Sequence, residues 1–310
     1  MIKVIGHKSP DTDTVCSAIA YAWALNQKSR AATAFCAGKL NKETAYVLDK
    51  FGFETPEILE SFSEGDEVVI VDTNNKDELV DGIESASIIE IIDHHKLTGS
   101  LSTDNPIPVI IKPLASTATI IWKYIKHSGF EVDSKIAGLL LCGIISDTLK
   151  FSSPTTTDQD KSAVDELLTI TGESLDSLAE AMFAAKGDLT GMSTRDVVLV
   201  DSKVFEMGSK KVRVSTLEST KPENVLAIKD AIVTDMELLK SEEKLDYAFF
   251  FAIDILNSNA TLLGGTPKER ELAETAFNTS FDGDLMKLDG VVSRKKQIIP
   301  ALQPVIESDN

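Results

Sequence analysis

Apolar and polar positions form two kinds of segment in the first half of the chain. Mainly apolar runs occur at 2–6, 68–72 and 88–93, and each ends in a glycine or an acid. Between and after them, 15–26 and 117–127 carry apolar residues at helical spacing. Continuous β-branched runs interleaved with helical patterns are typical of parallel strands covered on both faces. The pattern predicts an α/β fold with a doubly wound, mainly parallel sheet.

The apolar run at 136–145 fits a buried helix and a buried strand equally well, and it ends just before Asp147. Glycine and polar residues then interrupt the pattern at 187–191, which indicates a domain boundary. We therefore expect one domain over 1–188 and a second over 194–310.

The second domain differs from the first because its apolar runs are short and paired around turns. Such a pattern is typical of a smaller α/β domain with a mixed sheet. The predicted elements are hairpin strands over 197–205 and 212–217 around the turn 208–211, a long helix over 223–240, paired strands over 247–256 and 260–263, and a helix over 267–277.

Composition and charge narrow the class of protein. The 310 residues are 43% hydrophobic, enough for one large or two medium globular domains, and carry a formal net charge of −18. Nucleic acids and anionic membranes attract basic surfaces, so neither is expected as a partner. Three cysteines without a C-x-x-C pair argue against disulfides and thiolate zinc sites and favour the cytoplasm. The first residues lack signal-peptide features, and no apolar run approaches the ~20 residues of a membrane span.

Three of the four histidines lie in two short acidic motifs, residues 6–13 and Asp93-His94-His95. The carboxyl ends of neighbouring parallel strands meet at one edge of a sheet, so side chains that follow the strands can converge. Carboxylates with a few imidazoles suit Mn²⁺, Co²⁺ or Mg²⁺, and Zn²⁺ is also compatible. So many acids predict two ions that share one carboxylate and activate a hydroxide for attack on phosphorus. The candidate residues are His7, Asp11, Asp13, Asp72, Asp93, His94, His95 and Asp147.

A structural role is the alternative for each acid taken singly. Aspartate often caps a helix or forms a turn after a strand, which applies to Asp11, Asp13 and Asp72. The combination of two histidine-containing motifs favours the metal site. His127 has no acidic companion, so a surface or packing role is expected for it.

The cations Arg294, Lys295 and Lys296 stand together near the end of an acidic chain. They fit either a solvated basic patch or a clamp on phosphate oxygens. In an extended segment Lys295 would face the opposite way from the other two, so all three would not reach one ligand. Lys203 is a weaker candidate for a phosphate contact, with Lys210 and Lys211 of the nearby turn as rivals. Gly264-Gly265 lacks a phosphate-loop context and predicts a turn.

Together these motifs resemble the DHH phosphoesterase superfamily and, within it, the family II, manganese-type inorganic pyrophosphatases. The resemblance runs over nearly the whole chain, and the Ser-Arg-Lys-Lys-Gln ending is the part most specific to the pyrophosphatases. The motifs are Gly6-His7 with Pro10-Asp11-Thr12-Asp13-Thr14, Val71-Asp72, Ile92-Asp93-His94-His95, Ile145-Ser146-Asp147, Ser153-Pro154-Thr155 with Thr157-Asp158-Gln159-Asp160, and Val292-Ser293-Arg294-Lys295-Lys296-Gln297.

The resemblance implies an N-terminal DHH domain that binds metal and a C-terminal DHHA2-like domain that binds substrate. It implies that one metal is held by His7, Asp11 and Asp72, and a second by Asp13, Asp72, His94 and Asp147, with Asp72 bridging. His95 would lie beside the pyrophosphate. The implied phosphate contacts from the second domain are Lys203, Arg294 and Lys295.

The implied activity is hydrolysis of pyrophosphate to two phosphates by a metal-activated hydroxide in a cleft between the domains. The family resemblance also implies a cytoplasmic homodimer that associates through its N-terminal domain. Two Mn²⁺ per subunit are implied, with Co²⁺ as a substitute and Mg²⁺ entering with the substrate. Thr73 stands where relatives often have His, which bears on metal affinity and preference. No inserted nucleotide-sensing module is present, so adenylate regulation is not expected.

Two other functions stay open. One is another DHH activity, a phosphodiesterase or an exopolyphosphatase, although nucleotide-acting relatives usually carry a histidine beside a glycine-rich segment and Gly264-Gly265 has none. The other is a metal or phosphate sensor without catalysis, since a fold alone does not determine function.

Overall fold

The computed structural model describes residues 1–309, which divide into two compact units. The first unit is Met1–Ala185, and the second begins at Lys186. Among the described residues, none of the helices has the length and apolar character that crossing a bilayer requires.

The first unit is built on a parallel sheet, as the sequence predicts, and the sheet has six strands, of which β2, β3 and β6 are not among the predicted runs. The strand order is β3-β2-β1-β4-β5-β6, so the direction of strand addition reverses between β1 and β4. This strand order is that of a doubly wound fold, in which ligands bind near the point of reversal, although here the helices cover only one face of the sheet. The strands are β1 (Ile2–Ile5), β2 (Ala32–Cys36), β3 (Glu57–Ile58), β4 (Glu67–Val71), β5 (Ser87–Asp93) and β6 (Val109–Ile111).

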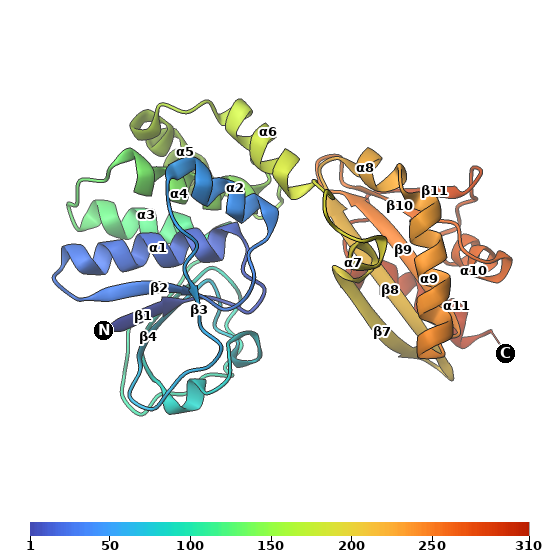
Figure 1. Cartoon of the computed structure of the whole chain (residues 1–310), viewed down its shortest axis with the longest axis horizontal. Helices are drawn as coiled ribbons and strands as arrows, with labels where there is room; N and C mark the ends of the chain where they lie inside the picture. Colours follow the sequence, from blue (N-terminus) through green and yellow to red (C-terminus); the bar gives the residue numbers. More distant parts are fainter. Residues whose placement is uncertain (310) are drawn as a thin grey trace. The chain divides into compact units, whose positions relative to one another are not determined.

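Both faces of this sheet are buried, but they are covered differently. Alternate residues of a strand point to opposite faces, so Val69 packs among the helices while Ile70 packs on the other side. The second face is covered by loops and two 3₁₀ turns, η1 (Lys76–Glu78) and η2 (Ile83–Ser85) (Figure 1). The helices on the first face are α1 (Thr12–Gln27), α2 (Lys42–Phe51), α3 (Thr117–His127), α4 (Ser134–Thr148), α5 (Asp158–Thr171) and α6 (Leu175–Lys186).

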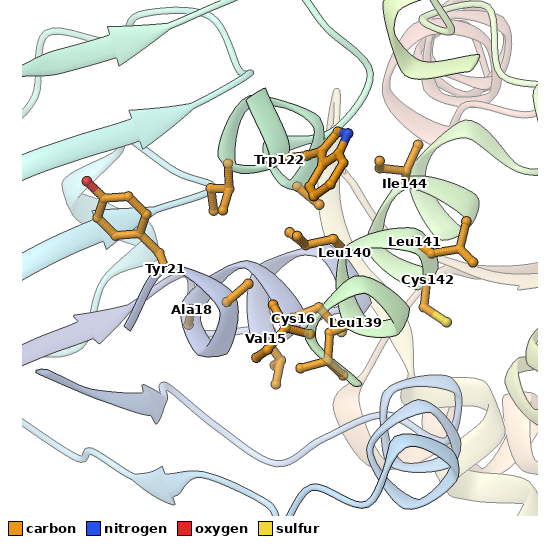
Figure 2. Packing of buried hydrophobic residues seen from close by; sticks show 14 of the residues in the cluster. Val15, Cys16, Ala18, Tyr21, Trp122, Leu139, Leu140, Leu141, Cys142 and Ile144 are labelled. Atoms are coloured by element: carbon orange, nitrogen blue, oxygen red, sulfur yellow. The ribbon is translucent and has the colours of Figure 1, made fainter. Parts of the chain in front are cut away.

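The apolar run at 136–145, which fits helix or strand, forms the buried helix α4. This helix packs against α1, α2, α3 and α5. Figure 2 shows Val15 and Cys16 of α1 beside Leu139 of α4. This packing places the end of α4, which carries Asp147, close to the start of α1, which carries Asp13.

The second unit contains a mixed sheet, again as predicted, and β11 is a fifth strand that is not among the predicted elements. Its order is β11-β10-β9-β8-β7, with β8 and β9 parallel and the other neighbours antiparallel. The strands are β7 (Asp201–Met207), β8 (Lys210–Ser219), β9 (Tyr247–Asp254), β10 (Asn259–Leu263) and β11 (Leu285–Asp289). The helices are α7 (Thr194–Leu199), α8 (Pro222–Leu226), α9 (Lys229–Glu243), α10 (Pro267–Phe277) and α11 (Ile299–Glu307), and a π-helical turn, η3 (Arg294–Ile298), precedes α11.

Three local predictions for this unit are wrong. The strand expected over 197–205 starts only at Asp201, because a capping box between Ser193 and Asp196 begins helix α7 before it. The long helix expected over 223–240 is divided at Ile228, whose φ of −112° and ψ of 18° leave the helical range. The segment 294–298 is π-helical rather than extended, so the argument from alternating faces does not apply to its cations.

Candidate metal centre

Six of the predicted side chains gather at one edge of the first unit's sheet. His7 follows β1, Asp72 follows β4 and His94 follows β5. The segments that follow β1 and β4 run in opposite directions along the sheet, because the strand order reverses between these two strands. The crevice between such segments is where doubly wound folds bind their ligands. Asp11 and Asp13 come from the start of α1 and Asp147 from the last turn of α4.

One group forms around His7. Its Nε2 atom lies 3.5 Å from Asp11 Oδ2 and 3.5 Å from Asp72 Oδ2. Asp11 is the N-cap of α1, and its Oδ1 accepts a hydrogen bond of 2.9 Å from the backbone N–H of Thr14. The expected helix-capping role and a ligand role therefore coexist in Asp11, one for each carboxylate oxygen.

A second group forms around His94. Its Nε2 atom lies 3.4 Å from Asp72 Oδ1 and 3.5 Å from Asp147 Oδ2. One ligand atom from each of Asp13, Asp72, His94 and Asp147 falls within 4.8 Å of the others. Asp72 therefore belongs to both groups, with Oδ2 toward His7 and Oδ1 toward His94.

Asp72, which belongs to both groups, has an uncommon backbone conformation with a φ of 63°. Aspartate tolerates the left-handed region better than most residues. Its side chain accepts hydrogen bonds from the hydroxyl of Thr14 on Oδ2 and from that of Thr117 on Oδ1, the latter at 2.9 Å. The carboxylate is thus fixed from both sides.

The ring of His94 shows which nitrogen is available to a metal. Nδ1 lies 3.0 Å from the carbonyl oxygen of Leu114, which can only accept, so Nδ1 carries a proton and donates it. Nε2 is buried and has no hydrogen-bond partner among the described residues. A histidine whose second nitrogen is tied to a carbonyl is the usual arrangement at metal sites.

Asp13 is held at the N-terminus of α3. The backbone N–H groups of Thr117 and Ala118 donate to its two oxygens at 2.7 and 3.0 Å. The hydroxyl of Ser116 adds a bond of 2.7 Å. Residues 116–118 therefore hold the carboxylates of Asp13 and Asp72 in place, and they are not among the site residues predicted from the sequence.

The charges of the site favour a cation. Burial and then repulsion from Asp72 raise the pKa of Asp13 to about 7. Burial and three neighbouring carboxylates raise the pKa of Asp147 well above its usual range. Burial lowers the pKa of His7 and His94, but their carboxylate neighbours outweigh it and raise the values to about 10 and about 9. A divalent ion would relieve the repulsion among the acids.

The donor set fits two divalent ions. His7, Asp11 and Asp72 form one potential group, and Asp13, Asp72, His94 and Asp147 form a second. A third set, Asp72, His94 and His95, overlaps the second, but His95 Nδ1 is 4.0 Å from Asp72 Oδ1 and nearer to Asp93. Oxygen and imidazole donors without thiolate suit Mn²⁺, Co²⁺, Mg²⁺ and Zn²⁺. The buried Nε2 of His94 makes no hydrogen bond to the described residues, yet it lies 3.4 and 3.5 Å from carboxylate oxygens of Asp72 and Asp147. This arrangement is the sharpest sign that a ligand belongs between them.

His95 differs from His94 in both exposure and partners. Its side chain is 54% exposed, and Nδ1 lies 2.9 Å from Asp93 Oδ1. That carboxylate also accepts the backbone N–H of His95 at 3.0 Å and, through Oδ2, the side-chain amide of Asn74. Asp93 is thus not in either ligand group of His7 or His94. Instead it orients the His95 ring and raises its pKa.

The predicted phosphate contacts of the second unit differ among themselves. Lys203 on β7 and Lys295 in η3 are exposed. Arg294 is only 8% exposed, and its guanidinium donates to the carbonyl oxygen and to Oδ1 of Asp201 at 2.7 and 2.6 Å. Arg294 is therefore already paired within its own unit.

The residues for which no primary site role was expected are His127, Gly264-Gly265, Lys210 and Lys211. His127 is exposed at the end of α3, in agreement with a surface role. Gly264-Gly265 connects β10 to the N-cap of α10 and is a turn. Lys210 and Lys211 begin β8 after the turn at Gly208.

The fold and the paired ligand groups define a class of protein. Residues 1–144 match the model of the DHH family, N-terminal domain, and residues 180–305 match that of the DHHA2 domain. The chain is a DHH-family protein whose second domain is of the DHHA2 type.

Relatives narrow the class further. A Bacillus cereus protein is 37% identical over 308 residues and a Bacillus licheniformis protein 36% identical over 307 residues, each match covering 99% of both chains. Both are named as probable manganese-dependent inorganic pyrophosphatases. A crystal structure from Methanococcus jannaschii, assigned to the family II inorganic pyrophosphatases, is 35% identical with a TM-score of 0.72, covering 98% of this chain and 99% of that one. The chain belongs to the family II, manganese-dependent inorganic pyrophosphatases, which confirms the resemblance seen in the sequence.

Proposed function

We propose that this protein hydrolyses inorganic pyrophosphate to two phosphates. The observation that carries the proposal is the pair of ligand groups that share Asp72, in a chain whose relatives bear the name of that activity. His7, Asp11 and Asp72 would hold one Mn²⁺, and Asp13, Asp72, His94 and Asp147 the other. When bound, the ions would supply positive charge to phosphate oxygens and lower the pKa of a water molecule.

The side chains around the ligands support distinct roles. His95 lies next to His94 and is exposed, and Asp93 fixes its orientation, so it is suited to donate a hydrogen bond to a substrate oxygen. Its pKa is raised, chiefly by the hydrogen bond to Asp93, which favours the protonated ring. We propose that His95 contacts the pyrophosphate and stabilises its developing charge.

We also propose that Lys203, Arg294 and Lys295 bind phosphate oxygens. The exposed ammonium groups of Lys203 and Lys295 are accessible to an anion. Arg294 would have to exchange part of its pairing with Asp201 for the substrate, so its contribution to binding should be smaller than that of an unpaired arginine.

The finer features of the family form part of the same proposal. They are two Mn²⁺ per subunit, Co²⁺ as a substitute, Mg²⁺ arriving with the substrate, a cytoplasmic location and a homodimer formed through the first unit. Equilibrium sedimentation of the metal-loaded protein tests the dimer, and a single species of monomer mass would exclude it.

Manganese-dependent phosphate release tests the activity itself. Metal-free protein should bind two Mn²⁺ per chain and then release phosphate from pyrophosphate much faster than from tripolyphosphate or a dinucleotide. Asp147→Asn should abolish release while the fold is kept. Asp158→Asn, at an exposed carboxylate of α5, is the matched control and should be unaffected. Absence of release by the manganese-loaded protein would refute the proposal, and faster turnover of tripolyphosphate would favour an exopolyphosphatase.

A further inference from the structure

Glu43 is a fully buried carboxylate in the first turn of α2. Its Oε2 atom accepts a hydrogen bond of 3.0 Å from the hydroxyl of Thr12 and one of 2.8 Å from the hydroxyl of Ser146. Thr12 is also fully buried, and Ser146 is 5% exposed. A single carboxylate oxygen therefore joins the beginning of α1 to the end of α4.

The two hydroxyl residues lie next to predicted metal ligands. Thr12 stands between Asp11 and Asp13, and Ser146 directly precedes Asp147. Three of the six ligand candidates are therefore adjacent in sequence to a residue that Glu43 holds. The link spans distant parts of the chain, because Glu43 and Ser146 are 103 positions apart.

A second contact from α2 strengthens the link at α1. The hydroxyl oxygen of Thr44 lies 3.1 Å from that of Thr12, and Thr44 is fully buried. α2 also packs directly against both α1 and α4. The start of α2 thus connects the segment that carries Asp11 and Asp13 to the segment that carries Asp147.

Packing alone does not require a carboxylate at this position. Burying a charged group is costly unless hydrogen bonds compensate, and an apolar side chain of similar length would fill the space at lower cost. The first turn of α2 offsets part of this cost, since a helix N-terminus favours negative charge. What the carboxylate adds is the ability to accept two hydroxyl groups at one point.

The ligands need an exact spacing to share one ion. Asp13, Asp72 and Asp147 lie together, and the packing of α4 on α1 brings the segments that carry Asp13 and Asp147 side by side. Packing of apolar side chains does not by itself fix the positions of two carboxylates, whereas directional hydrogen bonds do. The hydrogen bonds of Glu43 act on the residues next to both.

We propose that Glu43 is a positioning residue that sets the distance between the Asp11–Asp13 segment and Asp147 and thereby tunes metal affinity. This inference rests on the proposed function, because it assumes that those aspartates bind metal. Glu43 is not part of the potential ligand groups of His7 and His94.

Manganese affinity of the metal-free protein tests the inference without any assay of activity. Glu43→Met keeps the length of the side chain but removes the strong acceptor, and it should weaken Mn²⁺ binding about 10- to 100-fold, as other changes behind metal ligands do. Glu43→Gln keeps an oxygen that can accept both hydroxyls and should bind Mn²⁺ within about threefold of the unmutated protein. Binding is measured by the loss of the free Mn²⁺ signal in electron paramagnetic resonance.

Glu269 provides a matched control in the second unit. Its carboxylate is 2% exposed and accepts the backbone N–H groups of Ala248 and Thr266 at 2.7 and 2.8 Å. Glu269→Met should lower thermal stability but leave Mn²⁺ affinity unchanged. If Glu43→Met does not fold, Ser146→Ala removes one donor of the same tether and should weaken Mn²⁺ binding in the same direction.

The outcomes separate the two proposals. If the unmutated protein binds no Mn²⁺, the proposed function fails. If it binds Mn²⁺ and the folded Glu43→Met or Ser146→Ala protein binds it equally well, the positioning role of Glu43 is refuted. Equal losses of Mn²⁺ affinity in Glu43→Met and Glu269→Met would refute it too, because the effect would then follow stability alone.

Discussion

Gly143 of α4 lies against Asp13, and its replacement by alanine tests whether that carboxylate belongs to the metal centre. A Cβ atom at Gly143 would lie 2.8 Å from Asp13 Oδ1 and 3.0 Å from Ala118 Cβ. Ordinary contacts begin near 3.4 Å, so Asp13 or α4 must move by about 0.6 Å, the difference between 3.4 and 2.8 Å.

The magnitude follows from two opposing effects. Alanine favours the interior of a helix over glycine by about 1 kcal/mol. Overpacking of a buried position costs about 1–3 kcal/mol. The net loss of unfolding free energy should therefore be about 0–2 kcal/mol, and the protein should still fold. The shift of Asp13 disturbs its bonds to Thr117 and Ala118, so Mn²⁺ affinity should fall about 10- to 100-fold.

Gly138→Ala, on the same helix, is the matched control. There the new Cβ would overlap the ring of Phe51, the last residue of α2, at the opposite end of that helix from Glu43. Thermal unfolding and Mn²⁺ titration of both metal-free variants give the comparison. Gly138→Ala should lose more stability than Gly143→Ala but keep its Mn²⁺ affinity. The reasoning is refuted if Gly143→Ala binds Mn²⁺ as tightly as the unmutated protein, or if Gly138→Ala loses as much affinity.

Three further measurements probe the charges. In the metal-free protein the pKa values of about 10 for His7 and about 9 for His94 leave both rings protonated at pH 7.5, so Mn²⁺ binding should release at least two protons per chain to a pH indicator; release of fewer than one proton would contradict these values. Because both pKa values are raised above 6.5, the rings contribute stability that is complete below pH 6.5 and is lost as the pH rises through 9–10. With a chelator present, the melting temperature should therefore fall as the pH rises through 9–10. Ionisation of Asp13, whose pKa is raised to about 7, also lowers stability as the pH rises and acts in the same direction. A melting temperature that rises with pH would contradict this reasoning. Lys295→Ala should raise the KM for pyrophosphate about tenfold and Lys296→Ala less than about threefold, which initial-rate kinetics can compare; equal effects would argue for a diffuse basic patch.

Much of the fold is predictable because its signals are local. The buried parallel strands are continuous β-branched runs, and such runs need no knowledge of distant residues. The break between α8 and α9 has no such signal, since neither Ala227 nor Ile228 is a helix-stopping residue. The start of α7 did have one, the capping box of Ser193 and Asp196, but the apolar run that follows it also fits a strand.

For the candidate site, the sequence predicts the ligand candidates but not the residues that hold them in place. Acids and histidines at strand ends stand out in the sequence, and the structure brings six of them together. The groups that hold them do not stand out, because serine, threonine and glutamate are common and their partners are far away in the chain. Glu43 meets Ser146 only after α2 and α4 have packed. The pairing of Arg294 with Asp201, 93 positions away, is hidden for the same reason.

The wide spacing of the ligand candidates, from His7 to Asp147, has a consequence for the folding equilibrium. No short piece of the chain contains a complete group, so an ion that needs one can bind only after the sheet, α1 and α4 have assembled. Metal binding then acts by mass action on the native state alone. At a free-ion concentration one hundred times the dissociation constant, it would add about 2.7 kcal/mol to the free energy of unfolding. The supply of manganese would thereby set the fraction of the protein that is folded at equilibrium.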